Sequence, residues 1–357
     1  MSQAAKILVF RLGSIGDFVI SMPSFQLIRQ RYPAAEIVLL TNEPENSRIV
    51  PADSILQGTG LVDRYLKYPG GTRDPHELRL LKQEIRAYAP DLMIYLAAPR
   101  GLLATYRDFL FFRWCGITRI VGLPGTPDRA DSRPPAKGSA LWEREAERLA
   151  RQLLPLGPVD FSLQASRALN LSAEEIGEAA RLLDRSFPDH GAGQARRVFG
   201  LSIGTNQPIN DWGDANWRAV LEELRRLDFG LVLLGGKEDR LRSRQLVENW
   251  PGPVLNLCGE ASVRMSGAVL KHLRLLLCHD SGPMHIAAAV GTRCVAVFSR
   301  RNPPGKWFPL GAGHKVLYPL ARAASIRSIA PRQVIAAAVD ALGTAETGLA
   351  PLPQRAG

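Results

Sequence analysis

Residues 277–291, LCHDSGPMHIAAAVG, decide the fold. A largely aliphatic run, Leu273–Cys278, ends in a polar turn that begins at His279, and Pro283 then opens an alanine-rich segment that Gly291 closes. Proline just inside a helix start and glycine just past its end are typical of a capped helix. The stretch therefore predicts a strand, a turn and a short helix. The free N–H groups and dipole of such a helix suit a phosphate, although an ordinary strand-to-helix turn has the same pattern.

The composition is that of a globular protein, with 46% hydrophobic and 22% charged residues in a chain of 357. This length predicts two domains, and no apolar run approaches the ~20 residues that span a bilayer. The N-terminal residues enter a strand directly and lack the apolar segment of a signal peptide. Four scattered cysteines without a CxxC pair are expected to be reduced core residues, namely Cys115, Cys258, Cys278 and Cys294. These features predict a cytoplasmic protein.

The net charge of +11, from 45 Lys and Arg against 34 Asp and Glu, favours acidic partners. Most of the excess is arginine spread over many segments, and no RRM, zinc-finger or basic-zipper signature is present. A phosphate-rich substrate at a membrane surface fits this charge at least as well as nucleic acid, and no nucleic-acid partner is predicted.

Strands and helices alternate along the whole chain, which indicates an α/β protein with doubly wound parallel sheets. Strands are expected at residues 6–10, 36–40, 63–68, 90–97, 119–122, 198–203, 230–236, 254–257, 273–278 and 294–298. Helices are expected at residues 18–32, 46–51, 74–88, 101–115, 141–157, 171–183, 215–227, 238–249 and 331–343. We predict a first domain at 1–170, a helix and linker at 171–196, a second domain at 197–343 and a disordered tail at 344–357.

Four polar loops follow predicted strands, at Arg11–Asp17, Thr205–Trp212, Gly235–Asp239 and His279–His285. Ligands of open α/β sheets bind at the carboxyl ends of the strands. The four loops are therefore expected to share a site in a cleft.

In the first loop, Gly13 and Gly16 permit tight turns close to a ligand. The spacing is not GxGxxG and no acidic residue ends the second strand, so a nicotinamide dinucleotide is not expected. Asp17 has two interpretations, which are the N-cap of the following helix and a general base that takes a proton from an attacking hydroxyl.

In the second half, Asp280, Ser281 and Gly282 offer N–H groups and a hydroxyl to a diphosphate. His285 lies one helical turn further on the face of Ser281, where a packing role is the alternative. Lys237 suits a phosphate and Glu238 a ribose, unless their loop is simply solvated. There is no DxD pair, HExxH motif or His/Cys cluster, so no metal site is predicted.

Together these residues resemble the motifs of glycosyltransferase family 9, the ADP-heptose:lipopolysaccharide heptosyltransferases and their relatives. The family's RxGxxGD is matched by Arg11, Gly13, Gly16 and Asp17. Its D-[ST]-G-x-x-H-x-A-A-A is matched by Asp280, Ser281, Gly282, His285 and Ala287–Ala289. Residues 298–311, FSRRNPPGKWFPLG, resemble a further family segment, and the likeness covers about residues 5–343 in consistent order.

The resemblance implies a GT-B fold, in which two Rossmann-like domains face a cleft. The first domain would bind the acceptor and the second the nucleotide sugar, with the last helix packing back toward the first domain. The implied reaction is inverting transfer, without metal or cofactor, from a nucleotide-diphospho-sugar such as ADP-heptose. The implied acceptor is a phosphorylated or lipid-linked glycan such as the lipopolysaccharide core, at the cytoplasmic face of the inner membrane.

The resemblance also assigns roles to residues. Asp17 would be the catalytic base, with Arg11, Gly13 and Gly16 forming the acceptor-side loop. The donor would be held by Thr205, Asn206, Asn210, Trp212, Lys237, Glu238, Asp280, Ser281, Gly282 and His285.

One departure from the family lies in its K-x-W-P motif, where Asn210 replaces the lysine and Gly213 the proline. Losing a charge-assisted contact costs on the order of 1.5–3 kcal/mol. Lys237, Lys306 or Arg300 would have to compensate, unless the donor differs or activity is lost. Residues 96–101, LAAPRG, replace a more polar family stretch, which leaves open an acceptor other than the inner core.

Three alternatives stay open. The segment Tyr106–Trp114, YRDFLFFRW, suits contact with lipid, or it is a core helix with Arg107 and Arg113 pointing outward. A second alternative is that the chain is a sugar-nucleotide 2-epimerase on the same fold. This alternative is disfavoured because the first half offers mainly Asp17 for proton transfer. The third alternative is a non-catalytic nucleotide-sugar-binding protein, which the neutral Asn210 would allow.

Overall fold

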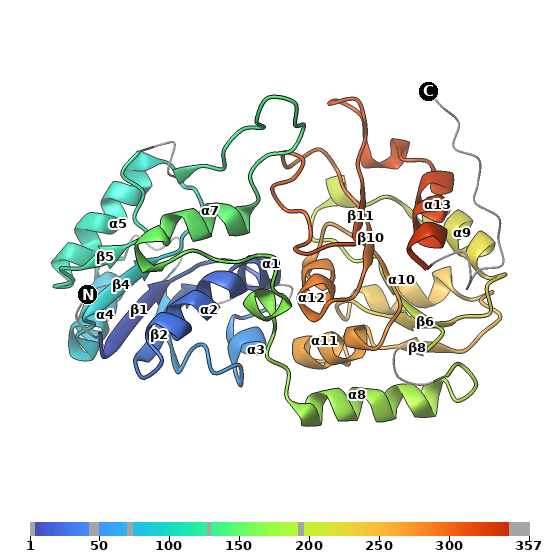
Figure 1. Cartoon of the computed structure of the whole chain (residues 1–357), viewed down its shortest axis with the longest axis horizontal. Coiled ribbons are helices and arrows are strands. Elements are labelled where there is room, and N and C mark those ends of the chain that lie inside the picture. Colours follow the sequence, from blue (N-terminus) through green and yellow to red (C-terminus); the bar gives the residue numbers. More distant parts are fainter. Residues whose placement is uncertain (1–3, 43–49, 70–73, 127–129, 192–195, 343–357) are drawn as a thin grey trace. The chain divides into compact units, whose positions relative to one another are not determined.

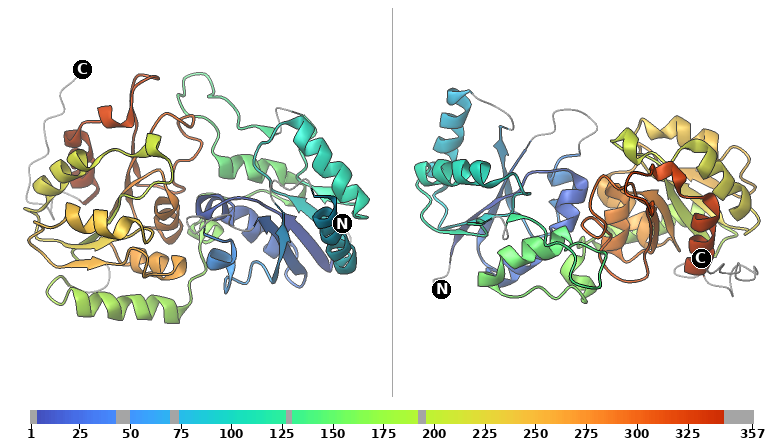
Figure 2. Two further views of the ribbon diagram at one scale, coloured as in Figure 1. Left: turned by 180° about the vertical axis from the view of Figure 1, so that it is seen from behind. Right: turned by 90° about the horizontal axis from the view of Figure 1, so that it is seen from above.

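The structure, a computed structural model, describes residues 4–42, 50–69, 74–126, 130–191 and 196–342. The chain divides into two compact units, Met1–Asn170 and Leu171–Gly357. Each unit is a parallel sheet with helices on both faces (Figures 1 and 2). The predicted α/β class with doubly wound sheets is therefore confirmed. The tail predicted at 344–357 and most of the helix predicted at 46–51 lie outside the described residues.

The sheet of the first unit has the strand order β3-β2-β1-β4-β5, and all its pairs are parallel. Its strands are β1 (Lys6–Phe10), β2 (Glu36–Asn42), β3 (Arg64–Tyr68), β4 (Leu92–Tyr95) and β5 (Ile120–Val121). The central strand β1 is buried from Ile7 to Phe10, as expected for a strand covered on both faces.

The helices of the first unit are α1 (Ile15–Ile20), α2 (Met22–Arg31), α3 (Asp53–Leu56), α4 (Pro75–Tyr88), α5 (Leu102–Trp114) and α7 (Glu145–Gln152). Side chains of α4 and α5 pack on one face of the sheet, and α2 lies beside α7 (Figure 1). The single helix predicted from Phe18 to Tyr32 is broken at Ser21. The Ser21 hydroxyl donates to the Asp17 carbonyl at 2.6 Å, and Pro23 follows without an N–H to continue the helix.

The sheet of the second unit has the order β11-β10-β9-β6-β7-β8 and is also parallel. Its strands are β6 (Val198–Ser202), β7 (Gly230–Leu233), β8 (Val254–Asn256), β9 (Leu276–His279), β10 (Cys294–Val297) and β11 (Lys315–Leu317). Its helices are α8 (Ala173–Ser186), α9 (Asp214–Leu224), α10 (Asp239–Leu246), α11 (Val263–Lys271), α12 (Gly282–Val290) and α13 (Pro331–Leu342). The sequence prediction did not include α11 and β11.

The helices of the second unit form two layers (Figure 1). Side chains of α9, α10 and α13 share a core with one face of the sheet, while α12 packs on β9 and β10 beside α11. The four cysteines are free and buried, which confirms their predicted core positions. Among the helices that the structure describes, none is long and apolar enough to cross a membrane.

The strand, turn and helix predicted for residues 277–291 are confirmed. Strand β9 ends at His279, Ser281 is the N-cap of α12, and Pro283 is its second residue. Gly291 ends the helix with φ at +86°, a left-handed conformation that favours glycine.

Both sheets reverse their strand order at a central strand. In the first unit β1 lies between β2 and β4, and in the second β6 lies between β7 and β9. Ligands of doubly wound sheets bind outside the carboxyl ends of strands at such a switch point. A ligand is therefore expected at the loops that follow β1, β6 and β9.

Candidate functional site

Asp17 is the third residue of α1, and the residue that caps this helix is Ser14. The Asp17 Oδ2 accepts hydrogen bonds from the Ser14 N–H at 2.9 Å and from the Ser14 hydroxyl at 3.2 Å. The interpretation of Asp17 as the N-cap is therefore wrong, since it closes a capping box from the third position. Its side chain remains 22% exposed, so part of the carboxylate is open to solvent.

Gly13 allows the Asp17 carboxylate to fold over the loop. A Cβ atom on Gly13 would lie 2.5 Å from the Asp17 carboxyl carbon, and its φ is +151°. The Gly13 N–H donates to the Asn42 side chain at 2.7 Å, which ties the loop to the end of β2. Gly16 lies in the first turn of α1. Both glycines of the motif thus belong to the turn that presents Asp17.

Arg11 fixes Asp17 from the protein interior. Its guanidinium is fully buried and donates to the Leu96 carbonyl at 2.8 Å and to the Asp17 carbonyl and Oδ1 at 3.1 and 3.3 Å. Burial lowers the pKa of Arg11, while the charges of Asp17 and Glu145 act in the opposite direction. Glu145 lies 3.8 Å from Arg11 and binds Arg148 through both carboxylate oxygens, at 2.6 and 2.8 Å. Sequence reasoning missed this buried network behind Asp17.

In the second unit, β9 pairs with β6, so Asp280 and Ser281 follow a strand adjacent to the one that leads to Thr205 and Asn206. The Ser281 hydroxyl lies 3.4 Å from the His279 carbonyl. Burial raises the pKa of Asp280 to about 6, although the Asn302 amide and the Arg301 charge lower it. A half-buried carboxylate near a helix start can accept hydrogen bonds from ligand hydroxyls.

His285 lies buried in the first turn of α12, with its ring 6.4 Å from that of Trp307 in an edge-to-face contact. Burial lowers its pKa to about 4, and the neighbouring His314 acts in the same direction. The imidazole is therefore neutral at pH 7, and it cannot supply positive charge to a phosphate. Its burial against Trp307 favours the packing interpretation.

His279 is a structural residue that sequence reasoning missed. Its Nε2 accepts a hydrogen bond from the Trp212 N–H at 3.1 Å, and its Nδ1 lies 3.0 Å from the Ile203 carbonyl. Because a carbonyl only accepts, Nδ1 must carry the proton and the ring is neutral. Burial accordingly lowers the pKa of His279 to about 4. This side chain ties the loop after β6 to the end of β9.

Two predicted donor residues lie in or against the core. The Trp212 indole is fully buried, donates to the Ile329 carbonyl at 2.9 Å and packs edge-to-face on Trp217. Its side chain therefore serves the fold, and its main chain is engaged as well, since the N–H donates to His279 and the carbonyl accepts from the Asn216 amide at 2.9 Å. Asn210 is also buried, and its Oδ1 accepts a hydrogen bond from the Ser299 hydroxyl at 2.5 Å.

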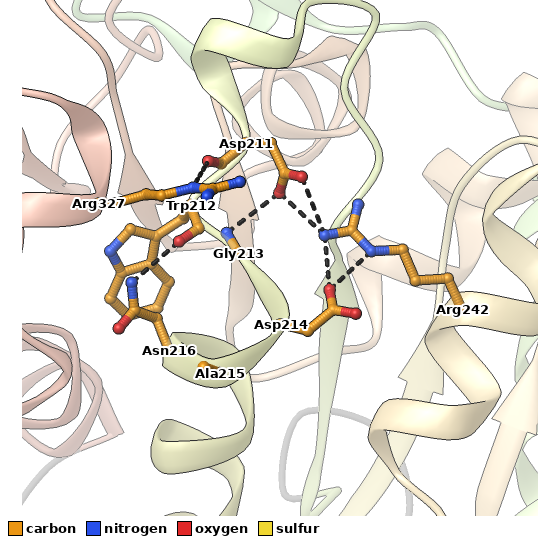
Figure 3. Close-up of a pocket in the computed structure, with 8 residues that line it drawn as sticks. All are labelled: Asp211, Trp212, Gly213, Asp214, Ala215, Asn216, Arg242 and Arg327. Atoms are coloured by element: carbon orange, nitrogen blue, oxygen red, sulfur yellow. Dashed lines mark hydrogen bonds and ion pairs between the residues drawn. The ribbon is translucent and has the colours of Figure 1, made fainter.

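A pocket of about 500 Å³ lies at the start of α9, beside the Trp212 main chain (Figure 3). Arg242 bridges Asp211 and Asp214 there, with contacts of 2.9 Å to the first and 2.7 Å to the second. Arg327 reaches the Asp211 carbonyl at 3.4 Å. The charges of this pocket are thus largely paired with one another, which suits a stabilised turn more than a ligand site.

The loop after β7 carries Lys237 and Glu238, both of which are exposed. A Cβ on Gly259 would lie 2.6 Å from the Lys237 Cα, so this loop packs closely on its neighbour. The Thr205 hydroxyl donates to the Gln207 carbonyl at 3.2 Å in the loop after β6. In the described ranges, no group of three or more His, Cys, Asp or Glu side chains is placed to hold a metal ion.

The sequence comparisons agree with one another. The family described as "Glycosyltransferase family 9 (heptosyltransferase)" matches residues 149–326. The chain is 24% identical to lipopolysaccharide heptosyltransferase 1 of Pseudomonas aeruginosa over 319 residues, 84% of this chain and 79% of the relative. It is 23% identical to lipooligosaccharide heptosyltransferase 2 of Haemophilus ducreyi over 84% of each chain.

Solved structures share the fold. A family 9 glycosyltransferase from Veillonella parvula superposes with a TM-score of 0.71 at 21% identity, covering 95% of this chain and 97% of the other. ADP-heptose lipopolysaccharide heptosyltransferase II of Escherichia coli gives a TM-score of 0.61 at 19% identity, covering 94% and 98%. These likenesses confirm the predicted GT-B fold with two Rossmann-like domains.

Proposed function

Because the chain is a glycosyltransferase that resembles family 9 in motifs and fold, we propose that it transfers a sugar from a nucleotide-diphospho-sugar to a cell-envelope glycan. Heptose from ADP-heptose and the lipopolysaccharide core are the favoured donor and acceptor, since the relatives are named lipopolysaccharide and lipooligosaccharide heptosyltransferases. The observation that carries this proposal is the Asp280-Ser281-Gly282 turn, which opens α12 beside the loop after β6 at the switch point of the second sheet.

The proposed mechanism is an inverting displacement without a metal. Asp17 takes the proton of the acceptor hydroxyl while its oxygen forms a bond to the anomeric carbon. The bond from that carbon to the diphosphate oxygen breaks, and the nucleoside diphosphate leaves with the electron pair. The N–H groups and dipole at the start of α12, with Ser281 and Thr205, stabilise the departing charge. The Asp280 carboxylate accepts from donor hydroxyls.

The donor is tested by thermal shifts with ADP, UDP, GDP and their sugars. ADP and ADP-heptose are expected to raise the melting temperature, because a ligand at a hundredfold its Kd adds about 2.7 kcal/mol to stability. A chain that no nucleotide stabilises would contradict the donor site. Binding without transfer to a heptose-free core would favour the binding-protein alternative that Asn210 suggests, and conversion of the nucleotide sugar itself would favour an epimerase.

The variant Asp280→Asn tests in the same panel whether the Asp280 carboxylate contributes to donor binding. The raised pKa of about 6, against roughly 3.9 when unfolded, means that the wild type loses stability as pH rises from 4 to 6. The variant lacks this cost, so without ligand it is expected to be more stable than the wild type at pH 7.5, by about half that margin at pH 5, and equal to it below about pH 3.5. Its shift with a nucleotide sugar at pH 7.5 is expected to be smaller. A variant that is less stable at pH 7.5 would contradict the buried charge.

We place the reaction at the surface of the inner membrane because of the outer face of α5. Leu103, Tyr106, Leu110 and Trp114 recur at helical spacing and are 48–89% exposed, with exposed Arg107 and Arg113 on either side. The alternative of a core helix is only partly right, since Thr105, Asp108 and Phe112 are the residues that it buries. An apolar stripe flanked by arginines fits a bilayer that contains anionic lipid.

The variant Leu103→Ser/Leu110→Ser is expected to lose co-sedimentation with vesicles of phosphatidylglycerol and phosphatidylethanolamine. Its stability should change little, because both side chains are exposed. Leu241→Ser on α10, where Leu241 is 66% exposed, is the matched control and should sediment like the wild type. Equal sedimentation of all three proteins would remove α5 as the contact surface.

A further inference from the structure

A second pocket in the C-terminal unit, of about 480 Å³, follows the carboxyl end of β10. It is enclosed by three segments, at residues 208–211, 299–301 and 322–327. Four arginines are among its lining residues, the half-buried Arg300 and the exposed Arg301, Arg322 and Arg327. We refer to it as the arginine pocket.

The positive charge of the arginine pocket is not balanced from within. Asp211 is the one acidic residue of its lining, and that carboxylate binds Arg242 outside the pocket at 2.9 and 3.2 Å. Among the described residues, neither Arg301 nor Arg322 forms an ion pair within 4 Å, and the acidic group on which the charge of Arg301 acts is Asp280, outside the lining. Like charges gathered in one cavity repel one another, so a bound anion would relieve this repulsion.

Part of the pocket is already held in place. Arg300 donates to the Pro319 and Leu320 carbonyls at 2.9 and 2.8 Å, and its guanidinium stacks on the Tyr318 ring at 5.5 Å. The Arg327 Nε lies 3.4 Å from the Asp211 carbonyl. A planar guanidinium fixed in this way loses little entropy when it binds an oxyanion through two hydrogen bonds.

The arginine pocket also adjoins the residues proposed for the donor. Ser299 of its lining donates to Asn210, which stands where the family has a lysine. The charge of Arg301 acts on Asp280 of the donor turn. The pocket thus brings positive charge to the neighbourhood from which the lysine is missing.

We propose that the arginine pocket binds a phosphate-type oxyanion and supplies the charge that Asn210 lacks. The anion is either the diphosphate of the nucleotide sugar or a phosphate of the acceptor, and this assignment rests on the proposed function. The guanidinium groups bind and hold the anion, while Asp17 remains the base of the reaction.

The test is calorimetric titration of the full chain with inorganic pyrophosphate. The variant Arg301→Gln/Arg322→Gln is expected to bind at least tenfold more weakly than the wild type, because charge-assisted hydrogen bonds are lost. Arg218→Gln/Arg244→Gln removes two exposed arginines of α9 and α10 and should bind like the wild type. Equal binding by the pocket variant, or an equal loss in the control, would overturn the proposal.

Two further titrations distinguish the source of the anion. Weaker ADP binding by the pocket variant with unchanged adenosine binding assigns the pocket to the donor diphosphate. Unchanged ADP binding with a raised KM for a phosphorylated acceptor assigns it to the acceptor. A third outcome separates the two proposals. If the wild type transfers no sugar but binds pyrophosphate through these arginines, the proposed function is rejected while the anion site is supported.

Discussion

Asp17→Asn is expected to lower the rate of sugar transfer by about 10²–10⁴-fold, the usual contribution of a positioned general base. The amide keeps the size of the side chain and an oxygen that can accept from the Ser14 N–H, so α1 should keep its first turn. It cannot take up a proton from the acceptor hydroxyl. The measurement is kcat with saturating donor and acceptor, alongside the Kd of the nucleotide sugar, which should not change.

Asp74→Asn provides the matched control. Asp74 caps α4 and accepts from the His76 N–H at 2.8 Å, so the same exchange of carboxylate for amide occurs at an exposed helix start. The control should lose at most about 1–2 kcal/mol of stability and keep full turnover. Asp17→Asn should lose more stability than the control, because it also removes the charge 3.3 Å from the buried Arg11. A turnover of Asp17→Asn within threefold of the wild type would remove Asp17 as the base.

The sequence predicted the strands and the loops between them because buried parallel strands are continuous apolar runs, which polar residues interrupt at the carboxyl end. Strand β1 was predicted at its observed bounds, and the polar loops at Arg11–Asp17 and His279–His285 follow strands as expected. Helix α11 was missed because the segment VRMSGAVLK is short and its good helix formers are interrupted by Val263, Gly267 and Val269. It is stabilised by packing between α8 and α12 and by Ser262 as N-cap.

The contacts that support the site depend on residues distant in sequence. His279 accepts a hydrogen bond from the Trp212 N–H, which is 67 residues away in the sequence. The Ser299 hydroxyl donates to Asn210, which is 89 residues away. The arginine pocket gathers three segments that have no motif in common. Local sequence patterns predict where the loops lie. Which residues of different loops contact one another depends on the order of the strands in the sheet, which local patterns do not give.

The buried network behind Asp17 leads to the second large effect. Glu145→Leu is expected to lower the free energy of unfolding of the N-terminal unit by about 3–5 kcal/mol, because it leaves the buried Arg148 without its partner. Arg11 also loses an opposite charge at 3.8 Å. Denaturant unfolding followed by circular dichroism measures the change.

The pair Glu222 and Arg225 on α9 has the same three-residue spacing as Glu145 and Arg148, but its side chains are 65% and 43% exposed. Glu222→Gln is therefore the matched control and should cost below about 1 kcal/mol. Equal losses in the two variants would mean that burial does not set the cost of breaking the pair.

The double variant Glu145→Leu/Arg148→Met tests whether the loss comes from the uncompensated charge. An apolar pair of similar volume avoids the desolvation cost of both ions, so this variant should be more stable than Glu145→Leu alone. Recovery should be incomplete, because Arg148 also donates to the Ala97 and Ala130 carbonyls at 3.1 Å each. A double variant as unstable as the single one would show that those carbonyl contacts, and not the buried charge pair, hold the structure behind Asp17.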